Sequence, residues 1–214
     1  MSHENAAGSS ARREYERRRA KDEARLRADW GPLGGVAVAL SGERQSTRAW
    51  ATGAAGEERL GALLDGLRSE GSRTLHDRRI PGSRANIDHM VVTPGGVWIV
   101  DAKRYKGRPE LRIEGGLLRP RAGKLYVGGR DKTALVDGVE WQLARVAQLL
   151  GEVPLYGVLC FVDADWPLFG GAFQVRAVEV LWPRKLMARV RAAESQLLDV
   201  EAVAAQLTSA FRPA

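Results

Sequence analysis

The stretch from Asn86 to Lys103 constrains the fold more than any other part of the chain. Its first half is rich in β-branched residues, and its middle, Thr93-Pro-Gly-Gly96, has the composition of a turn. The second half again has the alternating pattern that favours a strand. We therefore predict a β-hairpin at this position.

The register of the hairpin follows from its turn. With Pro94 and Gly95 in the two central turn positions, counting outward places Asp88 opposite Asp101, on the same face of the sheet. Lys103, two residues further along, shares that face. Opposed like charges repel, and a divalent cation between the two aspartates would remove the repulsion. Carboxylate oxygens suit Mg²⁺ or Mn²⁺ better than zinc. The same counting pairs Thr93 with Gly96, Val92 with Val97, and Met90 with Ile99.

Lys103 adds a second chemical group to this face. Beside a metal-bound carboxylate, an ammonium group can orient a water or stabilise the negative charge that builds on a phosphoryl group during hydrolysis. The alternative is a plain salt bridge between Lys103 and one of the two aspartates. The spacing alone leaves both interpretations open.

The remaining residue types favour few other chemistries. Three histidines and one cysteine are too few to favour a zinc cage. His89 points away from Asp88 in the predicted register, so we expect a packed side chain. Cys160 lies in an apolar run and is expected to be a buried small hydrophobe. Asp163 and Asp165 form a rival carboxylate pair, but they are more simply the exit of a strand into a turn. No glycine-rich phosphate loop is present.

The charge of the chain favours a polyanionic partner. Its 214 residues carry a net charge of +7, with an isoelectric point near 10.0. Nucleic acid or an acidic membrane surface would suit this charge. The N-terminus is too polar for a signal peptide, and no apolar run is long enough to span a membrane. We expect a cytoplasmic protein without a membrane partner.

The order of the predicted elements favours an α/β fold, with a mixed central β-sheet flanked by helices. Residues 1–52 are expected to form an N-terminal unit, a basic helix over 11–28 followed by a linker. A solvated helix explains 11–28 better than a dedicated nucleic-acid arm. Residues 53–170 form the main domain, and 171–214 a C-terminal helical extension on the core. Besides the hairpin, we expect strands at 75–80, 111–113, 124–127, 155–162 and 178–181, a polar connector at 41–52, and helices at 57–67, 139–150, 195–211 and from Trp182 onward.

Glu57 stands out in the first helix of the main domain. It shares a helix face with Leu60 and Leu64, which is unusual for a carboxylate. A charge at a helix start, favoured by the helix dipole, is the commoner explanation. Alternatively, Glu57 is a third carboxylate within reach of the face that carries Asp88 and Asp101.

Several short segments, in this order, resemble a known family. They are Gly53-Ala-Ala-Gly-Glu57, Asn86-Ile-Asp-His89, Thr93-Pro-Gly-Gly-Val97, and Asp101-Ala-Lys103 followed by Gly107. This pattern is similar to the nuclease-related domain, called NERD, which is grouped with the PD-(D/E)XK nuclease superfamily. The similarity extends over about residues 53–165. One position departs from it, because members usually carry glutamate where this chain has Asp101.

The resemblance implies a restriction-endonuclease-like core with Mg²⁺ or Mn²⁺ at the hairpin. It implies that Glu57, Asp88 and Asp101 are the metal-site carboxylates and that Lys103 is the electrostatic catalyst. It also implies that Gln142 corresponds to a glutamine often found on the following helix.

Together these observations lead us to expect a metal-dependent nuclease that acts on DNA. Arg104, Lys106 and Arg108, next to Tyr105, would contact phosphate near the site, since backbone contacts favour Arg and Lys. The alternative for these three residues is a solvated loop. The competing hypothesis for the whole protein is a non-catalytic nucleic-acid-binding or adaptor module that retains the nuclease fold.

Overall fold

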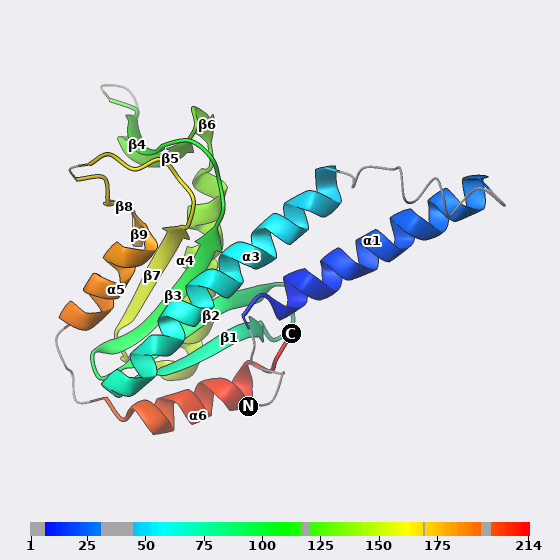
Figure 1. Cartoon of the computed structure of the whole chain (residues 1–214). Coiled ribbons are helices and arrows are strands. Elements are labelled where there is room, and N and C mark those ends of the chain that lie inside the picture. Colours follow the sequence, from blue (N-terminus) through cyan, green and yellow to red (C-terminus); the bar gives the residue numbers. More distant parts are fainter. Residues whose placement is uncertain (1–6, 31–44, 117–119, 169, 194–197) are drawn as a thin grey trace.

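The computed structural model describes residues 7–30, 45–116, 120–168, 170–193 and 198–214. Most of the linker expected before residue 53 lies outside these ranges. Within them, the chain folds around a six-stranded sheet flanked by helices, as Figure 1 shows. The prediction of a mixed α/β fold is therefore confirmed.

The central sheet mixes antiparallel and parallel pairing. The first three strands in sequence form an antiparallel meander, and β7 and β9 continue the sheet in parallel from β3. Strand β8 closes it, antiparallel to β9. Sheet neighbours occur in the order β1 (Arg73–Arg79), β2 (Asn86–Thr93), β3 (Gly96–Lys103), β7 (Leu155–Phe161), β9 (Val178–Leu181) and β8 (Phe173–Val175).

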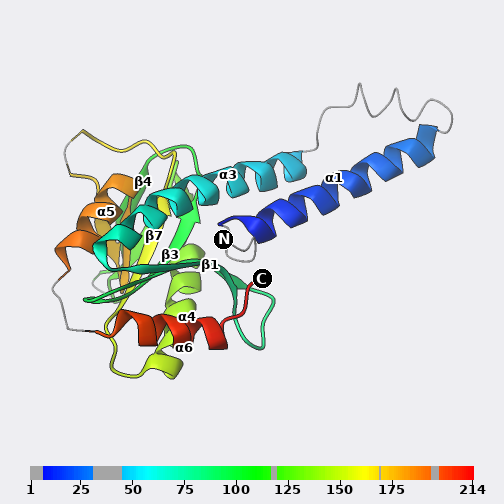
Figure 2. The ribbon, with the colours of Figure 1, turned by 60° about the horizontal axis from the view of Figure 1, so that its bottom comes forward.

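Helices cover both faces of this sheet, giving three layers (Figure 2). On one face lie α3 (Gln45–Asp65) and α5 (Pro183–Ala192), which bury Leu60, Leu64 and Leu186 against Trp98 and Val100, among others. On the other face lie α4 (Thr133–Leu150) and α6 (Val200–Ala210). Pro183 occupies the first turn of α5, as expected from its fixed φ.

The hairpin has the predicted register over most of its length. Thr93 pairs with Gly96, Val92 with Val97, and Met90 with Ile99. Gly96 is required at its position, because its φ is +135° and a Cβ there would lie 2.5 Å from the carbonyl oxygen of Pro154. The turn chemistry thus fixes which side chains of β2 and β3 share a face.

Helix α4 packs closely against β7, and a glycine makes this approach possible. A Cβ on Gly157 would lie 2.6 Å from Cδ1 of Leu143 and 3.0 Å from Cγ1 of Val139. On the same strand, Cys160 is fully buried, as predicted, and burial raises the pKa of its thiol. Strand β7 therefore lies in the core with both faces covered.

Several element boundaries differ from the prediction. Helix α3 begins at Gln45, so the expected connector is partly helical and the expected domain start at 53 falls inside a helix. Helix α4 begins at Thr133, before the apolar periodicity starts. Strand β8 was not predicted. A second sheet consists of β4 (Pro109–Glu114), β5 (Ala122–Val127) and β6 (Arg130–Asp131). A 3₁₀ turn, η3 (Gly66–Glu70), follows α3.

The basic helix α1 (Ser9–Trp30) lies alongside α3 and projects from the core with it (Figures 1 and 2). Its first turn is attached to the core, where the Ser9 hydroxyl donates a hydrogen bond to Asp77 at 2.6 Å. Arg12 pairs with Glu58 of α3 at 2.7 Å. The helix predicted as solvated is thus docked on the domain at one end.

The C-terminal tail lies beside β1. Pro213 forms a bridge with Arg78, and the backbone N–H of Arg79 donates to the carbonyl of Arg212. The N–H of Ala214 donates to the carbonyl of Asp77 at 3.0 Å. The tail therefore continues the central sheet past β1. Among the helices described, none is long and apolar enough to cross a membrane.

Candidate functional site

The regular hairpin ladder stops at Asp88. Pairing between β2 and β3 is regular only as far as His89 opposite Val100. Beyond that point, Oδ2 of Asp88 accepts a hydrogen bond from the backbone N–H of Ala102 at 3.0 Å. A side chain thus takes the place of a main-chain acceptor, and the predicted pairing of Asp88 with Asp101 gives way to this contact.

Strand β2 also changes orientation at Asp88. Ile87 and Met90 both pack into the core beneath α4 and α6. Strand alternation would put residues three apart on opposite faces, so the strand turns over between them. On β1, the residue opposite Asp88 is Asp77, which has a φ of +50°. The irregularity spans both strands and places the Asp88 carboxylate, in place of a main-chain carbonyl, against β3.

Asp101 and Lys103 form an ion pair at the end of β3. Asp101 is 7% exposed, and Lys103 also donates to the carbonyl of Ala102 at 3.3 Å. Burial lowers the pKa of Lys103, but Asp101 and Asp88 outweigh it and leave the pKa raised. The lysine is therefore held as a cation beside the two aspartates.

The pKa of the Asp88 carboxyl is strongly shifted by its surroundings. Burial raises its pKa well above the ordinary value, and the negative charge of Asp101 raises it further. Lys103 opposes the shift, whereas Glu57 and a hydrogen bond between the two aspartate side chains add to it. Two carboxyl groups in direct contact favour a shared proton, because both cannot be ionised at low cost.

Glu57 approaches this group from another layer. Alternation along β3 places Asp101 and Lys103 on the face covered by α4, whereas α3 covers the opposite face. Burial raises the pKa of Glu57 to about 7, with Lys103 lowering it and Asp77 and Asp101 raising it. The structure thus brings Glu57, Asp88, Asp101 and Lys103 within electrostatic reach of one another at one end of the sheet.

The donor chemistry of this group suits a hard divalent cation. Asp88 and Asp101 offer carboxylate oxygens whose mutual repulsion a cation would relieve in place of the shared proton. Within the described ranges, however, no group of three His, Cys, Asp or Glu side chains is arranged so that it could hold a metal ion. The carboxylates of Asp88 and Asp101 nevertheless fit such an ion by chemistry, and Glu57 is a further carboxylate that raises the pKa of Asp88.

Gln142 lies on α4, on the side of the sheet that carries Asp101. Its Oε1 is buried and has no hydrogen-bond partner in the described structure. An unsatisfied buried amide oxygen is costly and calls for a donor or a cation. This oxygen therefore makes no hydrogen bond to Asp88 or Asp101.

The basic segment after Lys103 is solvent-exposed at Arg104, Lys106 and Arg108. Arg104 forms an ion pair with Asp163, which follows β7. Tyr105 instead packs inward, with its ring 6.1 Å from that of Phe161. The two aspartates of the rival pair make different contacts. The side chain of Asp163 pairs with Arg104, whereas the backbone N–H of Asp165 donates to the carbonyl of Gly107.

A buried histidine pair beside Asp88 was not predicted from the sequence. His89 is fully buried, as expected for a packed side chain, and its Nδ1 lies 2.8 Å from Nδ1 of His76. Nε2 of His76 lies 3.1 Å from Asp65 at the end of α3. Burial lowers the pKa of both imidazoles. The chain of three polar groups ties α3 to β1 and β2, and only the strand pairing of residues 76 and 89 reveals it.

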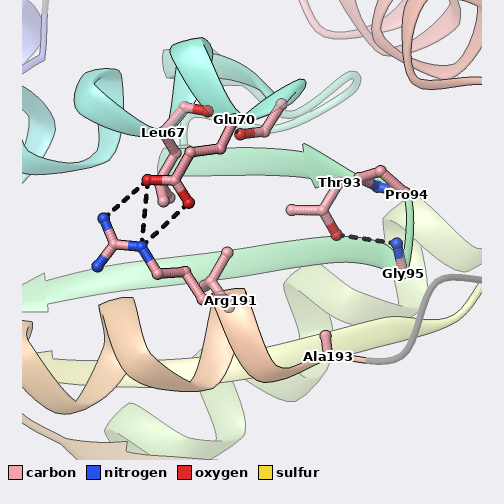
Figure 3. A pocket seen from close by; sticks show the side chains of 9 residues that line it. Leu67, Glu70, Thr93, Pro94, Gly95, Arg191 and Ala193 are labelled. Carbon is pink, nitrogen blue, oxygen red and sulfur yellow. Dashed lines mark hydrogen bonds and ion pairs between the residues drawn. The ribbon is translucent and has the colours of Figure 1, made fainter.

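A cavity of about 330 Å³ lies elsewhere, at the turn of the hairpin (Figure 3). Thr93, Pro94 and Gly95 line it on one side, and a multiply bonded ion pair between Glu70 and Arg191 borders it on the other. This cavity is at the opposite end of β2 and β3 from Asp88 and Lys103. It shares no residue with the carboxylate group, so we do not assign the chemistry to it.

Comparison with known proteins gives one match. The family model for the nuclease-related domain, NERD, matches residues 52–162. The match contains the hairpin, Glu57 and Gln142. No curated protein and no solved structure matches the chain.

Proposed function

Because the chain belongs to the nuclease-related domain family, we propose that it is a Mg²⁺- or Mn²⁺-dependent nuclease that hydrolyses phosphodiester bonds in DNA. The proposed site consists of Glu57, Asp88, Asp101 and Lys103. The observation that carries the proposal is the interrupted hairpin, in which Asp88 leaves the strand ladder and lies against Asp101 beside a charged lysine.

Asp88 and Asp101, with Glu57, would hold the divalent cation. When bound, such an ion polarises a phosphoryl oxygen and lowers the pKa of a coordinated water. Asp88 is oriented for this role by the N–H of Ala102, which donates to its Oδ2, and by the hydrogen bond between the Asp88 and Asp101 side chains. Gln142 supplies an unpaired amide oxygen on the neighbouring helix.

Lys103 has a different task. Its raised pKa keeps the ammonium group protonated at neutral pH, so it is a poor general base. A fixed positive charge next to the carboxylates instead stabilises the negative charge that builds on the phosphoryl oxygens. Arg104, Lys106 and Arg108 would contact the substrate backbone around it, since all three are exposed.

Cleavage of DNA by the purified protein tests the proposal. Supercoiled plasmid and linear duplex would each be incubated with the protein in the presence of Mg²⁺ or Mn²⁺. The wild type, Asp88→Asn and Lys103→Met would be compared in parallel. Each substitution is expected to lower the rate about a hundredfold or more, as for loss of one preorganised electrostatic group. Asp137→Asn and Lys185→Met, which change the same residue types on α4 and α5, should leave the rate unchanged.

Equal cleavage by wild type and both site variants would contradict the assigned site. The second candidate function is a nucleic-acid-binding or adaptor module. It is favoured by the lack, in the described ranges, of three side chains arranged for a metal ion. DNA binding by the wild type without any metal-dependent cleavage would support this second candidate.

A further inference from the structure

Asp77 of β1 connects three other segments of the chain beside the proposed site. Its Oδ2 accepts hydrogen bonds from the Ser9 hydroxyl at 2.6 Å and from the backbone N–H of Ser10, both in the first turn of α1. Its Oδ1 accepts one from the side-chain amide of Asn86, the first residue of β2, at 3.2 Å. Its backbone carbonyl accepts the N–H of Ala214 in the C-terminal tail. Because Asp77 is only 4% exposed, these contacts take the place of water.

The start of α1 is anchored on this carboxylate. A buried carboxylate is costly unless it accepts hydrogen bonds, and the N-terminal end of a helix is the positive end of its dipole. Ala7, just before the helix, packs so closely on α3 that a Cβ on Gly61 would clash with its own. Arg13 donates to the carbonyl of Ala214, and Figures 1 and 2 show the C-terminus beside this end of the helix. Asp77 is therefore the buried polar anchor of α1.

Asp77 also lies opposite Asp88. His76 pairs with His89, so counting one residue along each strand places residues 77 and 88 face to face. The regular pairing of β1 with β2 omits these two residues and resumes one residue further along. Asp77 has a φ of +50°, a left-handed conformation that aspartate and asparagine adopt more readily than most residues. The interruption thus includes both the residue that holds α1 and the residue assigned to the proposed site.

The segment that carries Asp88 is held from two sides. On β1, Asp77 engages Asn86, two residues before Asp88. On β3, the N–H of Ala102 donates to Asp88 itself at 3.0 Å. Between these two contacts, Ile87 is fully buried in the core. The orientation of the Asp88 carboxylate is therefore fixed by Asp77 as well as by Ala102.

Stability alone does not favour this arrangement. Continuous pairing of β1 with β2 would satisfy the same backbone groups without a left-handed residue or a buried charge. The charge of Asp77 also raises the pKa of Glu57, so Asp77 adds negative charge close to the proposed carboxylates. A local conformation that is unfavourable by itself and is held by its surroundings is characteristic of functional sites.

We propose that Asp77 is a positioning residue for Asp88 and that the first turn of α1, by binding Asp77, is part of the proposed site. Docking of α1 holds the Asp77 side chain, Asp77 holds Asn86, and the turnover of β2 then directs the Asp88 carboxylate toward Asp101. Asp77 acts through Asp88 and needs no contact with a metal ion or with DNA. The consequence for catalysis rests on the proposed function, whereas the positioning itself does not. Helix α1 lies outside residues 52–162, so the family match does not include it.

Hydrogen exchange at the Ala102 amide reports the position of Asp88 directly, because the Asp88 side chain accepts this N–H. Exchange would be followed by NMR in EDTA for the wild type, Asp77→Ala and Ser9→Ala. The amide should exchange about tenfold faster in Asp77→Ala and about two- to fivefold faster in Ser9→Ala, as for loss of one hydrogen bond. Amides of the regular ladder from Val97 to Val100 give the reference within each protein.

Asp77→Asn separates positioning from charge. Asparagine tolerates the left-handed conformation, its amide oxygen accepts the two donors of α1, and its amide nitrogen donates to the side chain of Asn86 once that amide rotates. Mn²⁺ binding would be titrated by electron paramagnetic resonance. Asp77→Asn should keep the protection of the Ala102 amide and a Kd within about twofold of wild type, whereas Asp77→Ala should bind Mn²⁺ about 10- to 100-fold more weakly. If Asp77 were itself a metal ligand, both variants would lose the ion equally.

Asp199 and Ser69 provide matched controls. Asp199 accepts a hydrogen bond from the N–H of Ala202 at the start of α6, as Asp77 does at the start of α1. The N–H of its neighbour Leu198 donates to the turn of the hairpin, at the opposite end from the proposed site. Ser69→Ala removes a hydroxyl that donates to a backbone carbonyl in η3. Asp199→Ala and Ser69→Ala should leave the measured amide exchange, relative to its reference, and Mn²⁺ binding unchanged, even where they lower overall stability.

The outcomes separate this inference from the proposed function. Unchanged exchange of the Ala102 amide in folded Asp77→Ala and Ser9→Ala overturns the positioning role, whether or not the protein cleaves DNA. Loss of Mn²⁺ binding in Asp77→Asn as large as in Asp77→Ala also overturns it. A wild type that neither binds Mn²⁺ nor cleaves DNA, with the exchange altered as expected in the variants, overturns the proposed function and leaves the positioning intact. Circular dichroism verifies folding, and if Asp77→Ala does not fold, Ser9→Ala decides.

Discussion

Asp88 and Ala102 are joined by a hydrogen bond of 3.0 Å in which a carboxylate, in place of a main-chain carbonyl, accepts the N–H of the facing strand. One side chain therefore has two tasks, to satisfy the backbone of β3 and to present negative charge beside Asp101. Asparagine can perform the first task and not the second, whereas alanine can perform neither. Comparing the two substitutions separates strand pairing from charge.

We predict that Asp88→Asn stabilises the metal-free protein at pH 8. The raised pKa of Asp88 means that its ionised form is disfavoured in the folded state, so removing the charge should increase the free energy of unfolding by about 1 kcal/mol. Asp88→Ala leaves the N–H of Ala102 unsatisfied and should be about 1–3 kcal/mol less stable than Asp88→Asn. Urea unfolding followed by circular dichroism measures both.

We predict that the wild type and Asp88→Asn respond differently to divalent cations. A ligand that binds only the folded state stabilises it by about 2.7 kcal/mol at a hundred times its Kd. Mn²⁺ should therefore raise the Tm of the wild type and leave that of Asp88→Asn unchanged. A wild type at least as stable as Asp88→Asn, or equal Mn²⁺ shifts in the wild type and Asp88→Asn, would contradict the electrostatic account.

A second prediction concerns His76. Burial lowers its pKa, with Asp65 opposing and Arg78 and Arg68 reinforcing the shift, so the neutral imidazole is the folded form. A base whose folded pKa lies below its unfolded value of about 6.5 contributes stability that is complete above pH 6.5 and is lost as the pH falls. The stability of the wild type relative to His76→Gln should therefore decline from pH 8 to pH 5.

The test must compare the free energy of unfolding of the wild type with that of His76→Gln at each pH. Glu57 and Asp88 have raised pKa values, so their protonation favours the folded state as the pH falls and partly masks the histidine. Urea midpoints at four pH values give the comparison. A constant difference across the range would show that His76 stays neutral or is equally perturbed when unfolded.

A third prediction tests the contact between α4 and β7. Gly157→Ala adds a methyl group 2.6 Å from Leu143 and should cost about 1–3 kcal/mol, because the helix cannot move away without disturbing the core. Leu143→Ala removes the clashing side chain, so the double variant should show a favourable coupling energy of about 0.5 kcal/mol or more. Additive losses in this double-mutant cycle would place the clash elsewhere.

The parts of the fold that are encoded locally could be predicted from the sequence. The composition of the turn from Thr93 to Gly96 indicates which residues occupy its central positions. The register of the two strands then follows by counting outward from the turn. The buried run of β7 and the helix beginning at Pro183 were also evident from local pattern. In each case residues close in sequence determine the structure.

The remaining features depend on contacts between distant segments. Helix α3 extends back to Gln45 although that region has no apolar periodicity, and α1 lies alongside it. The pairing of His76 with His89 depends on the register of β1 with β2. Arg59 on α3 meets Asp163, which follows β7, only through the packing of α3 on the sheet. The turnover of β2 at Asp88 likewise arises from β1, β2 and β3 together.

The C-terminal tail beside β1 has a consequence for behaviour at high concentration. An uncovered edge strand offers a row of free backbone donors and acceptors to other molecules and promotes aggregation. Here Arg212, Pro213 and Ala214 occupy part of that row, and the carbonyl of Asp77 is engaged by the last of them. These three residues thus cover part of the edge of β1 and leave fewer of its backbone groups open to another molecule.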